Sequence, residues 1–205
     1  TIRLTGRGPG CNGVRIMMRL RKYWHWYILG GVALTAFLIW NAVFWVEARQ
    51  GRVSVHFLDV GQGDAMFIES GNGNQILIDG GPDATVLARL GEVMPFWDRS
   101  IDLIILTHPH ADHLSGLIHV LRRYDIGMVL ESGVNHSIAE YDEWKRLIQE
   151  EGAIDSIARR GQVVRIDGSA ALDVLAPFES FDGESVKNIH DAAIVLKLSH
   201  ASPHT

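Results

Sequence analysis

The stretch that decides the fold is Thr107-His108-Pro109-His110-Ala111-Asp112-His113. It places three imidazoles and one carboxylate within six consecutive residues, directly after the apolar run Ile101–Leu106, which predicts a buried strand. Ordinary turns use Gly, Pro, Asn, Asp and Ser for backbone reasons, and no folding requirement calls for three histidines here. The stretch therefore predicts a metal site at the end of a strand.

The spacing of these side chains indicates how they share the metals. His108 and His110, two apart on a near-extended chain, can point to one side and bind one cation. Asp112 and His113 are adjacent at a turn that enters a helix, and they can reach a second cation. Imidazole and carboxylate ligands suit zinc first, with manganese or iron as alternatives. Two such ions can polarise a substrate oxygen and hold a bridging hydroxide, so we expect two divalent ions, zinc first.

The motif His108-x-His110-x-Asp112-His113 resembles the HxHxDH signature of the metallo-beta-lactamase fold. The flanking residues resemble one branch of it, the metallohydrolase domain of ComEC-type competence proteins. Phe57–Ala65 (FLDVGQGDA) matches the opening motif of that branch, and Ile76–Gly81 (ILIDGG) matches its second. The resemblance runs from about residue 53 to about residue 198. It implies a mixed α/β fold, the four-layer αββα sandwich, over residues 53–205.

The resemblance also implies roles for individual residues. The four signature side chains would bind the metals, and Asp112 would also orient the attacking water and share its proton. Asp64 and Asp79 lie in loops that the resemblance places beside the metals, where a carboxylate can fix the tautomer of a ligand histidine. Four glycines would let the backbone pass close to the site: Gly61, Gly63, Gly80 and Gly81.

The end of the chain departs from the family pattern. Asn188–Leu196 resembles the family's Asn-rich entry to a strand, but with Ala where Ser is usual and with an unusual His190, to which we give little functional weight. The family's Thr-Gly-Asp strand end, whose Asp bridges the metals, and its later His-His-Gly-Ser motif do not occur. We therefore expect a C-terminally truncated or frame-shifted product with an incomplete sandwich. His200 and His204 are not expected to replace the missing ligands, and the lone His136 is expected to be structural or solvated.

Charge is divided unevenly along the 205 residues. Residues 1–52 carry eight Lys or Arg and one Glu, whereas residues 53–205 carry eleven Lys or Arg and twenty-three Asp or Glu, a net charge of -12. Residues 1–26 are basic and begin with a glycine-rich segment, so we expect them to be disordered. The chain begins without Met, and we expect translation to start at Met17 or Met18. The single cysteine excludes an internal disulfide framework and a cysteine-rich zinc site.

An apolar run follows the basic segment. Residues 27–46 contain no Asp, Glu, Lys or Arg, and a helix of about 20 apolar residues spans a bilayer. Basic residues precede the run and tryptophans lie near both ends, so we expect a single-pass cytoplasmic-membrane anchor in contact with lipid. Its N-terminus would be in the cytoplasm and the hydrolase domain outside. A cleaved signal peptide and a buried core helix remain alternatives.

The rest of the sequence predicts short strands that alternate with amphipathic helices. Strands are expected at residues 53–59, 65–69, 75–78, 101–106, 128–131, 163–166, 171–175 and 193–198, with a hairpin turn at 71–74. Helices are expected at residues 82–94, from 113 to 121 and at 138–151.

The resemblance implies cleavage of phosphodiester bonds in single-stranded DNA, and we expect no obligate protein partner. The acidic charge of residues 53–205 opposes this, because affinity for DNA comes largely from Lys and Arg that neutralise phosphates. The metals and a local patch, such as Arg122-Arg123 or Arg159-Arg160, would have to offset the repulsion. Two alternatives stay open: a hydrolase of small esters, thioesters or lactones, and an inert fragment that binds a metal or a partner without turnover.

Overall fold

The computed structural model describes residues 11–49 and 52–201 and divides the chain into two units, residues 1–48 and 49–205. In the described part of the first unit the chain forms helix α1 (Cys11–Arg49). Residues 11–26 are thus helical, where the composition predicted disorder; after Gly13 this segment contains neither Gly nor Pro, and Arg, Leu, Met and Lys favour helices. Residues 1–10 lie outside the described part.

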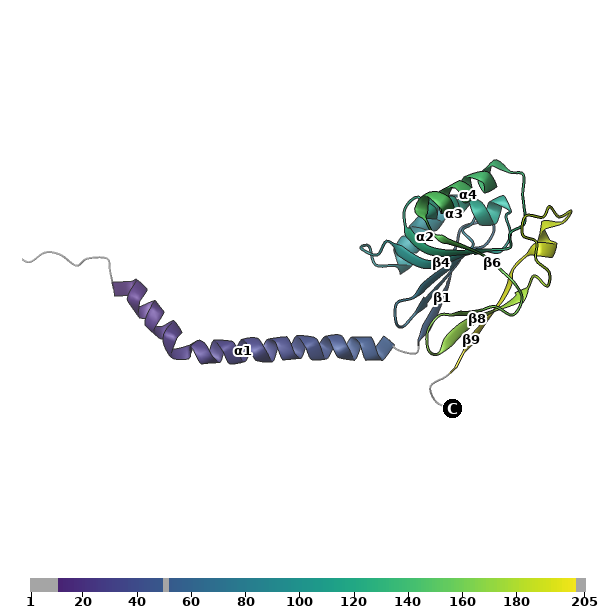
Figure 1. Cartoon of the computed structure of the whole chain (residues 1–205). Helices are drawn as coiled ribbons and strands as arrows, with labels where there is room; N and C mark the ends of the chain where they lie inside the picture. The colour runs from purple at the N-terminus through teal and green to yellow at the C-terminus, as the bar shows by residue number, and fades with distance from the viewer. Residues whose placement is uncertain (1–10, 50–51, 202–205) are drawn as a thin grey trace, which may run out of the picture. The chain divides into compact units, whose positions relative to one another are not determined.

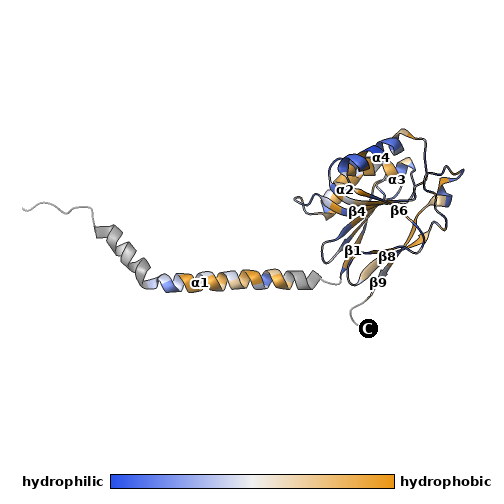
Figure 2. Ribbon diagram, in the orientation of Figure 1, coloured by the Kyte–Doolittle hydropathy of each residue, from blue (hydrophilic) through white to orange (hydrophobic). Residues whose placement is uncertain are grey.

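Within α1, the 22 residues Tyr23–Phe44 are long and apolar enough to cross a membrane. Most of this part of the helix has the colour of hydrophobic residues in Figure 2. None of the stretch is buried inside the protein, which argues against the core-helix alternative. A signal sequence near the N-terminus would satisfy the same criteria of length and composition.

The second unit contains two sheets. The larger sheet has six strands in chain order: β1 (Val53–Phe57), β2 (Met66–Ser70), β3 (Gln75–Ile78), β4 (Ser100–Leu106), β5 (Asp125–Glu131) and β6 (Ile154–Ile157). The pairs β1–β2 and β2–β3 are antiparallel, and the remaining pairs are parallel. The smaller, antiparallel sheet contains β7 (Val163–Arg165), β8 (Ala170–Ala176) and β9 (Val195–His200).

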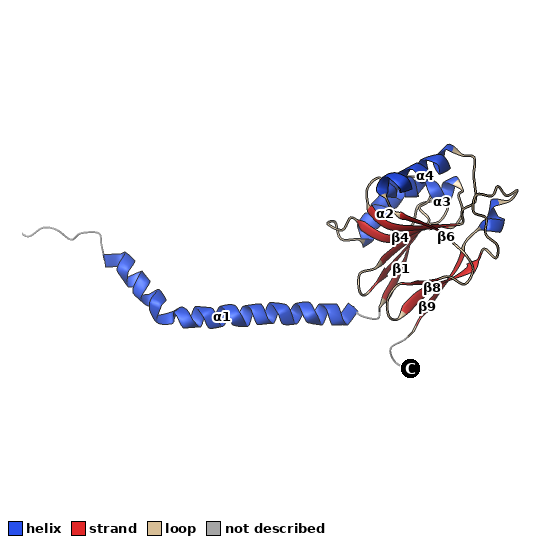
Figure 3. Cartoon of the chain, in the orientation of Figure 1, coloured by secondary structure: helices blue, strands red, loops and turns tan. Residues whose placement is uncertain are grey.

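Three helices cover one face of the larger sheet, and the smaller sheet lies on the other side (Figures 1 and 3). The helices are α2 (Thr85–Val93), α3 (Ala111–Leu121) and α4 (Ala139–Glu151), and a short 3-10 helix, η1 (Ile189–Ala192), precedes β9. One core lies between the helices and the larger sheet, and a second lies between the two sheets. The described residues thus form an α, β, β arrangement, three layers of the αββα sandwich.

Most predicted elements are present, with two differences of detail. Strand β6 and helix η1, each four residues long, were not predicted. The first strand was expected to reach residue 59, but β1 ends at Phe57, whose side chain is 79% exposed. Strand β1 is an edge strand of the sheet, so its apolar alternation does not secure burial.

A buried ion pair joins β5 to α4. Glu131 is 1% exposed, and its carboxylate accepts hydrogen bonds from the Lys145 ammonium and, at 2.9 Å, from the Trp144 indole. Burial raises the pKa of Glu131, and Lys145 opposes that shift. Lys145 also binds Asp155 on β6, at 2.7 Å. The group therefore connects α4 to two neighbouring strands.

We expect Glu131→Ala to lower the free energy of unfolding by about 1–3 kcal/mol, because the buried Trp144 indole N–H loses its partner while the Lys145 ammonium keeps Asp155. Urea unfolding of the full-length chain in detergent measures this. A double variant, Glu131→Met with Lys145→Met, should be more stable than Glu131→Ala, because it removes both charges. A Glu131→Ala variant as stable as the wild type would contradict this role.

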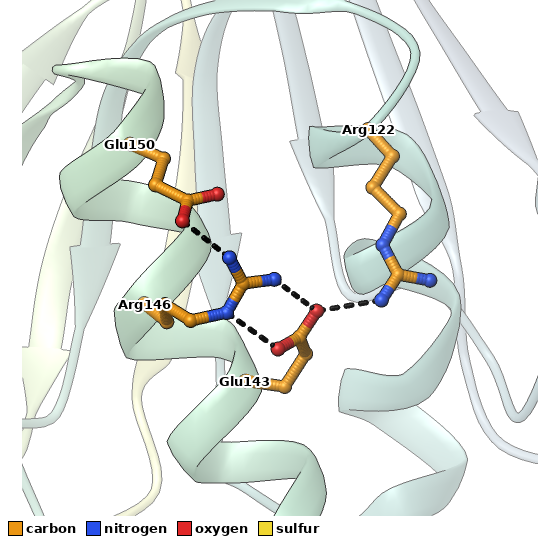
Figure 4. A network of polar contacts seen from close by, with 4 residues as sticks. All are labelled: Arg122, Glu143, Arg146 and Glu150. Carbon is orange, nitrogen blue, oxygen red and sulfur yellow. Dashed lines mark hydrogen bonds and ion pairs between the residues drawn. The ribbon is translucent and has the colours of Figure 1, made fainter.

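A network of ion pairs on α4 and the end of α3 supplies the matched control for Glu131→Ala (Figure 4). The Glu143 carboxylate accepts hydrogen bonds from Arg122, at 2.6 Å, and from Nε and Nη2 of Arg146. Nη1 of Arg146 donates to Glu150. These hydrogen bonds lower the pKa of Glu143 to about 2. Because water screens exposed ion pairs, Glu143→Ala should change the unfolding midpoint far less than Glu131→Ala does.

Candidate metal centre

The signature loop joins the end of β4 to the start of α3. Strand β4 ends at Leu106, and α3 begins at Ala111 with His110 in the extended N-cap position. The backbone carbonyl of His110 accepts from the N–H groups of His113 and Leu114, at 3.0 and 2.9 Å. The buried strand and the first turn of the helix thus hold the histidines of the loop at one edge of the sheet.

Three imidazoles meet at this edge: His108, His110 and His190. Each offers a ring nitrogen, and these atoms all lie within 4.8 Å of one another. The ring centroids are 4.7 Å apart for His108 and His110, 4.9 Å for His108 and His190, and 4.7 Å for His110 and His190. The sequence analysis paired the first two, but it gave little weight to His190, which the structure brings to the same point.

Two local contacts explain how His190 arrives there from a distant part of the sequence. Asn188 is the N-cap of η1, and its side-chain oxygen accepts from the His190 N–H. After η1, the Ile194 N–H donates to the Thr107 carbonyl at 2.9 Å, which fixes the entry to β9 against the end of β4. This tertiary contact and the pairing of β9 with β8 bring the two segments together.

Asp79 organises the other side of the loop. It is 3% exposed and adopts a left-handed conformation with φ of 56°, at the end of β3. One carboxylate oxygen accepts from the Thr107 N–H at 2.8 Å; the other accepts from the Thr107 hydroxyl at 2.6 Å and contacts His113 Nδ1 at 2.8 Å. Because Asp79 occupies Nδ1 of His113, the Nε2 nitrogen is the one that can coordinate a metal.

The pKa values of the histidines follow from this environment. Burial, followed by the neighbouring imidazoles, lowers the pKa of His108 to about 4, and burial and His190 also lower that of His110. Burial opposes protonation of His113, but the hydrogen bond and charge of Asp79 outweigh it and raise its pKa. His108 is therefore neutral at pH 7, as a metal ligand must be.

The donor atoms fit a divalent metal. Thr107 Oγ1 lies 3.0 Å from His108 Nδ1, so the other nitrogen, Nε2, points away from this contact. That Nε2 atom is buried and has no hydrogen-bond partner in the described residues. A buried polar nitrogen without a partner is costly, and three clustered imidazole nitrogens are a common zinc ligand set.

Asp112 and His113 lie directly beside the three-histidine cluster. The His113 ring is 4.2 Å from the His108 ring, and His113 Nε2 is 4.0 Å from an Asp112 carboxylate oxygen. The structure therefore puts all four predicted ligands at one centre. Asp64 lies close enough for its charge to raise the pKa of His113.

Two of the four predicted glycines are places where the backbone packs too closely for a side chain. A Cβ on Gly63 would lie 1.8 Å from the Asp112 carbonyl oxygen, and one on Gly80 would lie 2.6 Å from the Leu117 backbone nitrogen. Both contacts press against α3. A Cβ on Gly81 would meet Val60, whereas the space beside Gly61 is open.

Two further histidines differ in outcome. His136 follows β5, and its ring centroid lies 6.5 Å from that of His110, so the structure places it near the histidine cluster but not among its members. Strands β4 and β5 are parallel and end together, with Leu106 opposite Glu131, and this register would have predicted neighbouring loops. His200 pairs with Ala170 at the end of β9 far from η1, and His204 lies outside the described residues.

Residues 58–197 match the family model of the metallo-beta-lactamase superfamily. The chain belongs to this superfamily. Membership and the histidine cluster together support a metal-dependent hydrolase. No curated protein sequence matches the chain significantly.

Several solved structures are similar to this chain. A HARLDQ-motif mutant of a metallo-beta-lactamase from Cronobacter sakazakii is 18% identical, with a TM-score of 0.48 over 72% of this chain and 57% of that one. MEM-A1, a subclass B3 metallo-beta-lactamase from a soil metagenome library, is 17% identical, with a TM-score of 0.48 over 74% and 57% of the two chains. YhfI from Bacillus subtilis is 18% identical, with a TM-score of 0.41 over 60% and 52%. The chain thus spans 57% of the length of the first two.

Proposed function

We propose that this protein is a membrane-anchored, metal-dependent hydrolase that cleaves phosphodiester bonds, as the ComEC-type resemblance implies, with single-stranded DNA as a substrate. The observation that carries the proposal is the cluster of His108, His110 and His190, with ring nitrogens within 4.8 Å and a buried Nε2 atom that has no partner among the described residues. Two of these histidines also line a polar cavity, so a substrate can reach the cluster.

The chain's own residues divide the work. His108, His110 and His190 would hold one divalent ion, and Asp112 and His113 would contribute to a second. When bound, zinc or manganese would supply positive charge that polarises a phosphoryl oxygen and lowers the pKa of coordinated water. Asp79 holds the His113 ring in place through Nδ1. Asp112, beside His113, would orient the attacking water and take up its proton.

Activity with defined substrates tests the proposal. The full-length chain in detergent, supplied with zinc or manganese, should hydrolyse bis(p-nitrophenyl) phosphate and single-stranded DNA but not a thioester. We expect Asp112→Asn to lower kcat for the phosphodiester about 10²–10⁴-fold, because the amide cannot accept the proton. Hydrolysis of the thioester alone would favour the small-molecule alternative, and hydrolysis of neither substrate by metal-loaded protein would favour the inert fragment.

The same proposal includes the topology of the chain. The apolar stretch of α1 and the basic residues before it support an N-terminus in the cytoplasm and a hydrolase domain outside. Cys11 is the single cysteine of the chain, so its labelling reports on one side of the membrane only. In intact cells that express the chain from Thr1, labelling of Cys11 by a membrane-impermeant maleimide would contradict this orientation.

A further inference from the structure

A polar cavity of about 670 Å³ opens beside the metal centre. Its walls come from the loop between β5 and α4, from α4 itself and from the loop before η1, and it reaches His110 and His190. The residues that line it are mostly polar: His110, Asn135, His136, Ser137, Tyr141, Asp142, Lys145, Ser185, Val186, Lys187, Asn188, Ile189 and His190. The cavity is therefore the space in which a substrate would lie next to the histidines.

The two loops are bonded to each other, so their side chains are held in position. The Asn135 N–H donates to the Glu184 carbonyl and its side-chain amide donates to the Gly183 carbonyl, both at 2.8 Å, and the Gly183 N–H donates to the Gly133 carbonyl at 2.9 Å. Lys187 follows this anchored stretch and directly precedes Asn188, the cap of η1. The same short segment thus carries a cation and, three residues later, His190.

Apart from the histidines, the charged side chains of the cavity wall are Lys145, Lys187 and Asp142. Lys145 is engaged by Glu131 and Asp155, so its charge is already compensated. Lys187 has no hydrogen bond or ion pair within the described part of the chain, and its side chain is exposed. Lys187 is therefore the cation of this wall that is available to a ligand, and Asp142 is the group that opposes an anion.

The basic patches suggested by the sequence do not supply this charge. Arg122 is bound to Glu143 at 2.6 Å on the exposed face of the helices, and the Arg160 guanidinium lies over the Phe178 ring at 4.4 Å. Neither residue lines the cavity. Because the charge of Lys145 is already compensated, the free charges of the wall are those of Lys187 and Asp142, which sum to zero, although residues 53–205 carry -12. The cavity wall thus repels an anion less than the domain as a whole does.

From these observations we infer that Lys187 is a substrate-binding residue that holds an anionic phosphate group of the substrate beside the metal centre. The inference rests on the proposed phosphodiesterase function and names the residue that recognises the substrate's charge. A lysine ammonium binds phosphate as a point charge, so it selects for anionic substrates without selecting a base sequence.

Equilibrium binding tests this without turnover. The probe is a fluorescein-labelled, single-stranded oligothymidylate with phosphorothioate linkages, and fluorescence anisotropy gives its Kd for the zinc-loaded, full-length chain in detergent. We expect Lys187→Ala to raise Kd about 10-fold, because one phosphate contact is lost. Lys187→Arg should keep Kd within about 3-fold of the wild type, and Asp142→Asn should lower Kd, because it removes a repulsion.

Lys197→Ala is the matched control. Lys197 is exposed on β9 and does not line the cavity, and its replacement changes the net charge by the same amount. A Kd for Lys197→Ala within about 2-fold of the wild type would show that binding depends on the position of the lysine and not on the net charge alone. Equal effects of the two replacements would overturn the inference, because only the overall field would then act. No binding by the wild-type chain would also overturn it.

Kinetics separate this inference from the proposed function. With bis(p-nitrophenyl) phosphate, Lys187→Ala should raise KM and leave kcat within about 2-fold, the pattern of a lost binding contact. A wild-type chain that binds the oligonucleotide through Lys187 but cleaves no phosphodiester would refute the proposed function and leave the anion site standing. If the wild type cleaves the phosphodiester and Lys187→Ala has the same KM, the proposed function stands and the Lys187 anion site is refuted.

Discussion

The His108→Ala/His110→Ala variant is expected to lose tightly bound metal and, with it, hydrolysis of phosphodiesters. Two of the three clustered nitrogens disappear, so His190 is left as the only member of this cluster, and the adjacent site of Asp112 and His113 loses its neighbouring ion. The loss of metal affinity should exceed the ~100-fold effect that removal of an outer hydrogen-bond partner can have. Elemental analysis of the purified full-length chain measures the metal content, and the phosphodiester assay measures the activity.

Two single variants complete this experiment. His190→Ala should also weaken metal binding, because the structure places His190 in the same cluster. His200→Ala is the matched control, since His200 lies in β9 away from η1, and we expect its metal content to equal that of the wild type. Normal metal content in His190→Ala together with a loss in His200→Ala would refute this ligand assignment.

Asp79→Asn is the second variant with a large expected effect. Asp79 accepts from both the Thr107 N–H and the Thr107 hydroxyl and contacts His113 Nδ1. An asparagine that keeps the bond to the Thr107 N–H turns its NH₂ group toward His113 Nδ1, which favours the tautomer with the proton on Nε2. Because that proton blocks the nitrogen that faces the metal, we expect metal affinity to fall about 10–100-fold. Competition with a chromophoric zinc chelator measures it.

The fold should survive this change. Asparagine tolerates the left-handed backbone that Asp79 adopts, with φ of 56°, better than other non-glycine residues do. Asp173→Asn is the control of equal charge: Asp173 accepts from the Ser199 hydroxyl at 3.0 Å within the smaller sheet. If both variants bound zinc as the wild type does, Asp79 would have only a structural role.

The metal-binding stretch was readable from sequence because its ligands are close together in the chain. His108, His110, Asp112 and His113 follow a strand and enter a helix, so local geometry alone brings them to one place. The role of Asp79 could also be predicted from the sequence. It follows β3, which pairs with β4, the strand before the signature loop, and the resemblance placed its loop beside the metals. The role of His190 could not, because it comes from a four-residue 3-10 helix whose position depends on the pairing of β9 with β8 and on the Ile194–Thr107 hydrogen bond.

The amino-acid sequence by itself determined the superfamily, the signature loop, the order of most strands and helices, and the uneven division of charge. These are local properties, set by the period of apolar residues and by motifs a few residues long. Tertiary structure alone decided that His190 completes the histidine cluster and that His136 and Lys187 face the same cavity. The physical reason is that parallel strands end at a common edge, where loops distant in sequence meet through backbone hydrogen bonds that no local pattern records.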